Sequence, residues 1–413
     1  MTMPAITLFH VLQILALILL VLPAAYLLFF AVAGLFYRQH RPAGNPGFRK
    51  FVILIPAYRE DSVIVDTARD ALLQEYPSDR FEVVVIADSL GPQTLSSLRD
   101  LSITLIEVSF DQSTKTKALN QAMSQLYGDY DLAVVLDADN IMARDFLSRI
   151  NASFTGDLVA IQGHRTARNL DTSLAVLDAA SEEINNHLFR KGHRAAGLSS
   201  AIIGSGMAFR YDYFRELMSG ITAVGGFDKE IELRILERGH RIGYDEDAMV
   251  FDEKVRHASA FTTQRRRWLS AQAAYFRKGI GPAFSALVTR GNLDYFDKAV
   301  QFILPPRILL PMIFIATGAL FMIMNRYLGA SRLFDFIWVA GTIMCFLVFA
   351  LSLPGSFYNR KTARALLTLP KGVILMLASL ARIRGANRRF LHTEHGPVMA
   401  EHTVLTTTKT NTP

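Results

Sequence analysis

Leu132-Ala133-Val134-Val135-Leu136-Asp137-Ala138-Asp139-Asn140 is the stretch that decides the fold. Its five apolar residues, two of them β-branched, predict a strand buried on both faces. Two carboxylates follow one residue apart, and residues i and i+2 of an extended segment project to the same side. Ligands bind at the carboxyl ends of the strands in open α/β sheets. Asp137 and Asp139 are therefore predicted to hold one hard cation, Mg²⁺ or Mn²⁺. The alternative is that Asp139 or Asn140 only caps the next helix.

Earlier strands end in the same way, in polar residues. Strands are predicted over 51–55, 81–87 and 103–108, and helices from about residue 62 and over 115–126. Tyr58 and Glu60 follow the first strand, and Asp88 follows the second. Three strand ends that meet in one crevice are typical of a nucleotide site. The absence of Gly-x-Gly-x-x-Gly and of a Walker A sequence argues against a dinucleotide dehydrogenase or a P-loop NTPase.

The composition indicates a soluble domain joined to membrane segments. The 413 residues are 51% hydrophobic yet 20% charged, with a net charge of +7, and the mean hydropathy is +0.23. The single cysteine, Cys345, excludes an internal disulfide and a cysteine-based metal site. Residues 6–36 are almost uninterrupted apolar sequence, longer than the ~20 residues that cross a bilayer. Basic residues follow this run in place of a cleavage site, so we predict a retained transmembrane helix with the next domain in the cytosol.

The C-terminal part returns to the membrane. Spans are predicted over 302–324, which is apolar apart from Arg307, and over 333–353. Residues 365–380 are apolar but short and contain Pro370 and Lys371, so they are predicted to be interfacial or re-entrant, with a full span as the alternative. Basic residues at 360–364 and 382–389 predict a cytoplasmic C-terminus.

Several motifs occur in a fixed order along the chain. They are Ile-Pro-Ala-Tyr-Arg-Glu at 55–60, Asp88, Lys-Ala-Leu-Asn at 117–120, Asp-Ala-Asp at 137–139 and Gln-Arg-Arg-Arg-Trp at 264–268. The ordered set resembles the membrane-bound family 2 glycosyltransferases, which include the cellulose, chitin, hyaluronan and poly-N-acetylglucosamine synthases. The resemblance covers roughly residues 50–280. It implies an α/β GT-A fold, a UDP-sugar donor, a divalent metal and inversion at the anomeric carbon.

The resemblance also implies roles for individual residues. It places nucleotide-sugar binding on Tyr58, Glu60, Asp88, Lys117, Asp137, Gln264 and Arg267, acceptor binding on Gly204, Ser205 and Trp268, and the metal on Asp137 and Asp139. It places the catalytic base on Asp228, counted back from Gly239-His240-Arg241, with Glu230 as the second candidate. The reaction needs one such carboxylate to take the proton of the acceptor hydroxyl.

Each of these assignments has a structural alternative. A lysine at a helix start opposes the helix dipole unless a phosphate is bound there, and Lys115 competes with Lys117 for that role. Asp88 is otherwise a turn residue, Asp228 a helix cap, and Gly204-Ser205 a bulge. The basic helix of 257–278 is otherwise an amphipathic surface on anionic lipid. That alternative does not explain why Gln264, Arg267 and Trp268 share one helix face.

Five segments are predicted: a transmembrane helix (1–40), a cytosolic GT-A domain (41–255), interfacial amphipathic helices (256–297), two transmembrane helices (298–355), and an interfacial or re-entrant helix with a cytosolic tail (356–413). The predicted protein is an inner-membrane enzyme that extends a β-linked polysaccharide or oligosaccharide from a UDP-sugar. The alternatives are a single transfer to a lipid acceptor and a nucleotide-sensing binding protein. Expected partners are the UDP-sugar, a glycan or lipid acceptor, membrane lipids, and a homo-oligomer or export partner, but no nucleic acid.

Overall fold

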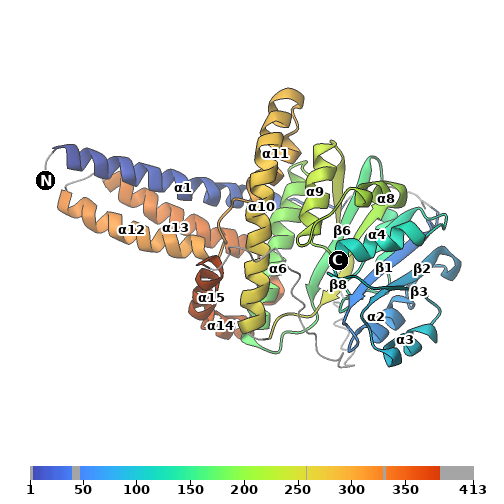
Figure 1. Cartoon of the computed structure of the whole chain (residues 1–413). Coiled ribbons are helices and arrows are strands. Elements are labelled where there is room, and N and C mark those ends of the chain that lie inside the picture. Colours follow the sequence, from blue (N-terminus) through green and yellow to red (C-terminus); the bar gives the residue numbers. More distant parts are fainter. Residues whose placement is uncertain (1–2, 40–46, 257, 329–331, 382–413) are drawn as a thin grey trace, which may run out of the picture.

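The structure is a computed structural model that describes residues 3–39, 47–256, 258–328 and 332–381. It consists of an α/β domain from which a bundle of long apolar helices projects to one side (Figure 1). Most of the predicted linker at 42–47, the basic stretch at 382–389 and the C-terminal tail lie outside the described residues.

An eight-stranded mixed sheet forms the centre of the domain, and its strand order is β3-β2-β1-β4-β7-β6-β8-β5. The strands are β1 (Phe51–Tyr58), β2 (Phe81–Asp88), β3 (Thr104–Val108), β4 (Leu132–Val135), β5 (Ile141–Met142), β6 (Leu158–Ala167), β7 (Met207–Arg210) and β8 (Arg241–Asp252). β1 pairs in parallel with both β2 and β4, whereas β7 is antiparallel to β4 and β6. The predicted strand at 132–136 is confirmed, and it lies between β1 and β7.

Alternate residues of the central strands feed two hydrophobic cores, one on each face of the sheet. Val52 and Leu54 of β1 belong to one core, and Phe51, Ile53 and Ile55 belong to the other. Helices α2 (Ile64–Ala71), α3 (Pro92–Arg99) and α5 (Phe146–Ser153) cover one face, and α4 (Lys115–Gln125), α8 (Tyr211–Ser219) and α9 (Phe227–Glu237) cover the other. This two-sided burial is why the strand sequences are continuously apolar.

A helix that changes its hydrogen-bonding pattern connects the domain to the bundle. α6 (Ser173–Asn185) continues into the π-helical segment η2 (Asn186–Gly192) and then into α7 (His193–Ala195). π-helical turns inside helices are frequent at functional sites. Gly192 lies so close to α1 that an added Cβ would stand 2.3 Å from the carbonyl oxygen of Phe30. α1 (Met3–Leu35) is therefore docked directly on the α/β domain.

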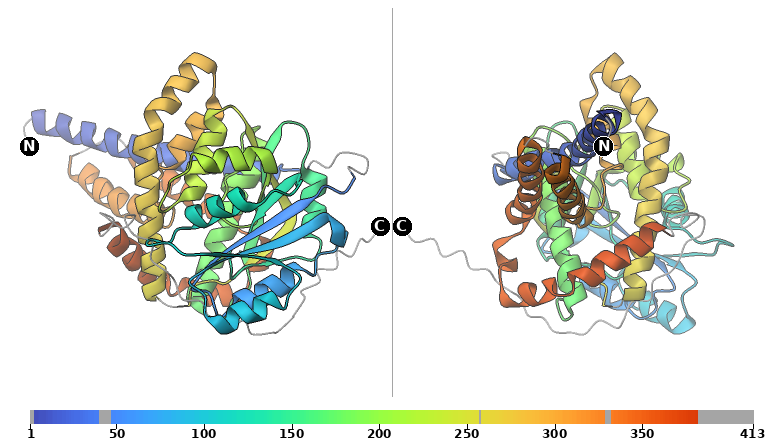
Figure 2. Two further views of the ribbon diagram at one scale, coloured as in Figure 1. Left: turned by 45° about the vertical axis from the view of Figure 1, so that its right-hand side comes forward. Right: turned by 90° about the vertical axis from the view of Figure 1, so that its left-hand side faces the viewer.

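The long helix α10 (Ala258–Arg290) runs between the domain and the bundle, and α11 (Leu293–Gln301) follows it (Figures 1 and 2). The described residues contain three helices long and apolar enough to cross a membrane, in α1, α12 (Leu309–Leu328) and α13 (Arg332–Ser352). The predicted start of the second span at residue 302 is wrong. α11 ends at Gln301, and Pro305-Pro306 keep the chain out of a helix until Leu309.

The apolar segment predicted at 365–380 is divided between two helices. α14 (Arg360–Leu366) and α15 (Leu369–Ala381) meet at an angle of 51°. α14 packs against α6 and α15 against α10, so both lie next to the α/β domain. A bent pair of this kind is either a broken span or a re-entrant loop, and the interfacial location stays a prediction.

Candidate active site

A cavity of about 840 Å³ opens at the carboxyl ends of β1, β2 and β4, a size typical of small-molecule sites. Tyr58, Glu60, Asp88, Asp137 and Asp139 all line this end of the cavity. The sequence therefore placed these five residues correctly in one crevice. From there the cavity passes α9 and α10 and continues to the helices of the bundle.

The ends of β1 and β2 are held in an unusual backbone conformation. Arg59 and Ser89 are the described non-glycine residues with positive φ, at 56° and 58°. The amide of Arg59 donates to the carbonyl of Asp88 (3.1 Å), and Ser89 Oγ donates to Asp88 Oδ1 (3.0 Å). Non-glycine residues in this region cost energy and cluster at ligand sites. The strain fixes Asp88, which is buried, at the edge of the cavity.

Asp137 and Asp139 occupy different environments at the end of β4. Asp137 is partly exposed and forms an ion pair with Lys115. Asp139 is buried. With its amide oriented so that the oxygen accepts from Ser205 Oγ (2.6 Å), Asn140 donates to Asp139 Oδ1 (3.2 Å) and Asp252 Oδ1 (3.1 Å). Asn140 therefore holds Asp139 in place.

These carboxylates fit a divalent cation only if the substrate completes its ligands. The described residues contain no group of three or more histidine, cysteine, aspartate or glutamate side chains placed to hold a metal. Mg²⁺ is commonly held by one or two carboxylates together with substrate phosphates and water. Asp252 is engaged by Lys254 at 2.7 Å. Asp137 and Asp139, both hard oxygen ligands, are thus the residues suited to a metal that arrives with a diphosphate.

Lys115, and not Lys117, points into the cavity. Residues 113–116 at the start of α4 line it, and Lys115 Nζ donates to the carbonyl of Gly204 (2.7 Å) and pairs with Asp137. Lys117 Nζ instead bonds to the carbonyl of Gln112 (2.8 Å) at the surface. A helix start with a lysine beside it is an anion site. We therefore propose the diphosphate role for Lys115, and the assignment to Lys117 is corrected on this geometry.

Replacing Lys115 by Ala is expected to weaken UDP binding by roughly tenfold or more, because a charge-assisted hydrogen bond to phosphate would be lost. Lys117→Ala is the matched control, since it removes the same charge from the same helix outside the cavity. Calorimetric titration of both variants with UDP and Mn²⁺ measures the difference. Equal weakening in the two variants would show that the helix start is only generally attractive to anions.

The two candidate bases lie on different sides of α9. Asp228 lines the cavity, its side chain is 16% exposed, and the nearest cation is Lys229 Nζ at 3.8 Å. Glu230 is buried, accepts from Arg234 Nη2 (2.6 Å) and Tyr275 Oη (3.3 Å), and is not among the residues that line the cavity. The geometry therefore favours Asp228 as the proton acceptor.

The Gln-Arg-Arg-Arg-Trp stretch lies on α10, and Gln264, Arg267 and Trp268 all line the cavity. Burial lowers the pKa of Arg267, while Asp137 and Asp228 act to raise it. Arg267 thus interacts electrostatically with both Asp137 and Asp228. The guanidinium of Arg265 stands 4.7 Å from the ring centre of Trp268, which orients that ring at the cavity wall.

Gly204 and Ser205 lie in different positions relative to the cavity. Gly204 lines it with φ +85°, and an added Cβ would stand 3.6 Å from Phe227 and 3.9 Å from Asp228. Ser205 is fully buried and accepts from the amide of Asp137 (2.9 Å). The predicted contact between Ser205 and the acceptor does not fit this position. We propose that Ser205 positions the Asp137 loop.

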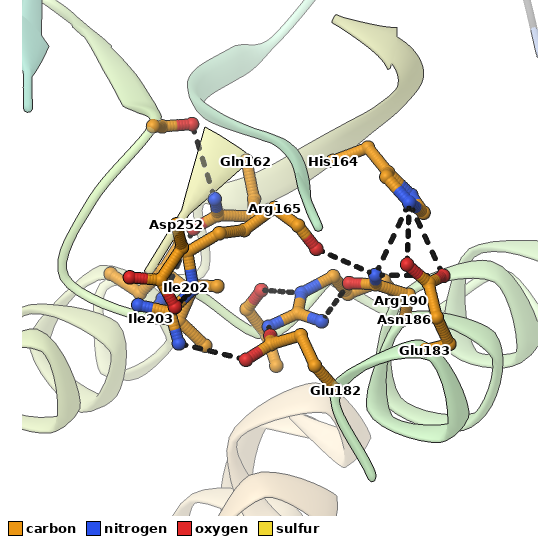
Figure 3. Close-up of polar contacts among 12 residues, drawn as sticks. Gln162, His164, Arg165, Glu182, Glu183, Asn186, Arg190, Ile202, Ile203 and Asp252 are labelled. Carbon is orange, nitrogen blue, oxygen red and sulfur yellow. Dashed lines mark hydrogen bonds and ion pairs between the residues drawn. The ribbon is translucent and has the colours of Figure 1, made fainter. Parts of the chain in front are cut away.

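Sequence reasoning missed a buried group of charges in the middle of the cavity. Arg165, Glu182, Arg190 and Asp252 all line it, and Figure 3 shows how β6, β8 and the α6–η2 helix bring them together. Arg165 bonds to Glu182 at 2.8 Å. Burial acts to raise the pKa of Glu182, but Arg165, Lys254 and Arg190 outweigh it and lower the pKa.

The chain is similar in sequence to several known glycosyltransferases. A family model described as "Glycosyltransferase like family 2" matches residues 46–271, more than half of the chain. The beta-monoglucosyldiacylglycerol synthase of Trichormus variabilis is 26% identical over 278 residues, which cover 64% of this chain and 54% of that protein. The probable glycosyltransferase YdaM of Bacillus subtilis is 23% identical over 257 residues, 60% of this chain and 61% of that protein. The chain thus spans little more than half the length of these relatives.

Among solved structures, the mannosyltransferase PcManGT of Pyrobaculum calidifontis, in complex with GDP-Man and Mn²⁺, superposes with a TM-score of 0.48. It is 19% identical, and the match covers 83% of this chain and 97% of that one.

Proposed function

Since the chain belongs to the family 2 glycosyltransferases and has their α/β GT-A fold, we propose that it transfers one sugar from a UDP-sugar to a lipid acceptor at the membrane. The sequence alone favoured a growing polysaccharide as the acceptor and offered a lipid as the alternative. The way the cavity continues from the strand ends to the apolar helices supports the lipid.

The observation that carries this proposal is the wall of the cavity away from the strand ends. Phe346 and Phe349 of α13 line it, as do Leu353 just after that helix and Leu369 and Met376 of α15. These residues belong to the helices of the bundle or pack next to it. A polysaccharide acceptor would meet mainly apolar surface there, whereas lipid chains are bound well by such walls. The name of one relative, a glucosyldiacylglycerol synthase, describes a glycolipid product.

The donor end supplies nucleotide recognition and charge neutralisation. Tyr58, Glu60 and Asp88 hold the nucleoside, while Lys115 and Arg267 face the diphosphate. Asp137 and Asp139 hold the divalent cation, which acts as a Lewis acid toward the leaving diphosphate when bound.

Transfer is a direct displacement with inversion at the anomeric carbon. The acceptor hydroxyl oxygen forms a bond to that carbon, the bond from the carbon to the diphosphate oxygen breaks, and UDP leaves. The hydroxyl proton passes to the carboxylate of Asp228, which lines the cavity beside Gly204. Trp268 packs against the acceptor headgroup.

The membrane location follows from the three long apolar helices. The C-terminal ends of α1 and α13 adjoin the catalytic domain, and basic residues follow both of them. These residues are Arg38 after α1, and Arg360, Lys361 and Arg364 after α13. Because basic residues mark the cytoplasmic side, we place the domain in the cytosol at the inner membrane. A transfer to lipid needs no pore, so the proposal includes no export partner.

The test is a UDP-release screen of the purified chain in lipid with UDP-glucose, UDP-galactose and UDP-N-acetylglucosamine, followed by mass analysis of the products. We expect UDP release that depends on lipid and a product that carries one sugar per lipid. A series of products with increasing numbers of sugars and no attached lipid would instead favour polysaccharide synthesis. UDP binding without release for every donor would favour a sensor.

A further inference from the structure

Three kinds of surface follow one another along the cavity. The proposed base, Asp228, stands near the donor end beside Gly204, whose carbonyl accepts from Lys115, the partner of Asp137. The buried charges come next, because Asn140 bonds to both Asp139 and Asp252, and Arg165 pairs with Asp252 and Glu182. The apolar walls of α13 and α15 come last. A molecule bound along this path meets a proton acceptor, then cations, then hydrocarbon.

The middle section carries an excess of positive charge. Its five cations are Arg165, Arg190, Lys254, Arg265 and Arg307, and its three carboxylates are Asp178, Glu182 and Asp252. We call these eight residues the cation cluster. The neighbouring Glu183 faces away from it, toward His164 and Thr166. Glu232, which also acts on Arg190, is paired with Lys298 Nζ at 2.8 Å and is not counted here. Buried charges without a partner are costly, so an anion of one or two charges fits this place.

Among the described residues, Arg307 is the cation of the cluster that forms no ion pair with a carboxylate, whereas Arg165, Arg190, Lys254 and Arg265 each do. Its Nη1 is buried and has no hydrogen-bond partner within the described part of the chain. The guanidinium stands 5.3 Å from the ring centre of Phe189 and lines the cavity. Burial, together with Arg265 and Arg190, lowers its pKa to about 10, so it is still cationic near neutral pH.

Arg307 also stands where the charged and apolar sections meet. The next residue, Ile308, packs with Met376 and Val373 of α15, and α12 begins at Leu309. A lone charge at the edge of an apolar segment is a functional-site candidate. Arg307 thus lies where the cavity enters its apolar section, between the walls formed by α13 and α15.

We propose that the lipid acceptor is anionic, with a phosphodiester between its acyl chains and the hydroxyl that receives the sugar, and that Arg307 binds this phosphate. The proposal rests on the lipid-acceptor function above and specifies its substrate class. The order base, cations and apolar wall matches the order hydroxyl, phosphate and chains in a phospholipid with a hydroxyl-bearing headgroup. The hydroxyl oxygen bonds to the anomeric carbon, UDP leaves, the proton goes to Asp228, and the phosphodiester is unchanged.

The experiment compares three probes on the purified full chain in micelles by native mass spectrometry. They are dioctanoyl phosphatidylglycerol, dioctanoylglycerol and glycerol 1-phosphate. We expect the phosphatidylglycerol to bind most tightly. Arg307→Gln should weaken its binding by roughly 10- to 100-fold, the usual worth of a charge-assisted hydrogen bond, and Arg307→Lys should weaken it less. UDP affinity, measured by calorimetry, should be unchanged in both variants.

Arg326→Gln is the matched control, because Arg326 is an exposed arginine near the far end of α12, the helix that begins just after Arg307. It should bind all three probes like the wild type. Equal binding of dioctanoylglycerol and phosphatidylglycerol, or unchanged binding in Arg307→Gln, would overturn the proposal. Binding of glycerol 1-phosphate as tight as that of the lipid would also overturn it and point to a site for a free phosphate.

Product analysis separates this proposal from the function on which it rests. Transfer to dioctanoylglycerol but not to phosphatidylglycerol would refute the anionic acceptor and leave a lipid glycosyltransferase. Binding of phosphatidylglycerol through Arg307 with transfer to no lipid would refute the lipid-acceptor function itself. Transfer to phosphatidylglycerol that Arg307→Gln weakens through KM rather than kcat supports both.

Discussion

Replacing Asp228 by Asn is expected to lower kcat by roughly 10²- to 10⁴-fold, the usual worth of general-base catalysis. Asn has nearly the same shape but does not accept the proton of the attacking hydroxyl. UDP affinity should be almost unchanged, because the role of Asp228 lies on the acceptor side of the reaction. Turnover by UDP release and UDP affinity by calorimetry, measured on the same preparation, separate these two effects.

Glu230→Gln is the informative comparison for this variant. Glu230 is bonded to Arg234 and Tyr275, so its replacement should reduce the melting temperature more than kcat. A Glu230→Gln protein that is folded but inactive, beside an Asp228→Asn protein with wild-type turnover, would reverse the assignment. Activity in both variants would show that the start of α9 does not carry the catalytic base.

Replacing Asp139 by Asn should abolish most turnover, by roughly 10²-fold or more, because metal stabilisation of the leaving group contributes several kcal/mol. Asn retains the size of the side chain and its hydrogen bond with Asn140, so the domain should remain folded. Binding gives a second readout. Mn²⁺ should tighten UDP binding in the wild type and have little effect in Asp139→Asn.

Asp145→Asn is the matched control for the metal experiment, since Asp145 is a partly exposed carboxylate paired with Arg149 at the start of α5. It should keep wild-type turnover and the wild-type response to Mn²⁺. Full activity of the wild type in excess EDTA would contradict metal dependence altogether.

The apolar pattern of the strands determined most of the fold. Burial on both faces of a sheet requires uninterrupted hydrophobic runs, and the runs at 51–55, 81–87 and 132–136 each became a central strand. The polar residues after them were found in one cavity because parallel strands end at one edge of the sheet. The long apolar helices could also be predicted from composition. The exception was the start of α12, because the prolines before it keep the chain out of a helix until Leu309.

The sequence alone could not decide between candidate residues that lie one or two positions apart. Lys115 and Lys117 both open α4, but only the direction of each side chain shows which one meets Asp137. Asp228 and Glu230 differ in the same way on α9, and Gly204 and Ser205 in the loop before β7.

Residues far apart in the chain are united only by tertiary structure. The cation cluster draws on β6, α6, η2, β8 with the segment after it, α10 and the loop before α12, and no local spacing connects them. Arg307 was visible in the sequence only as one charge in an apolar run. Its meaning depends on what lies around it, because the free energy of a charge is set by its partners and its burial. The sequence therefore determined a GT-A fold attached to helices long and apolar enough to cross a membrane, and the packing of α10, α13 and α15 against that fold decided where the proposed lipid acceptor would enter.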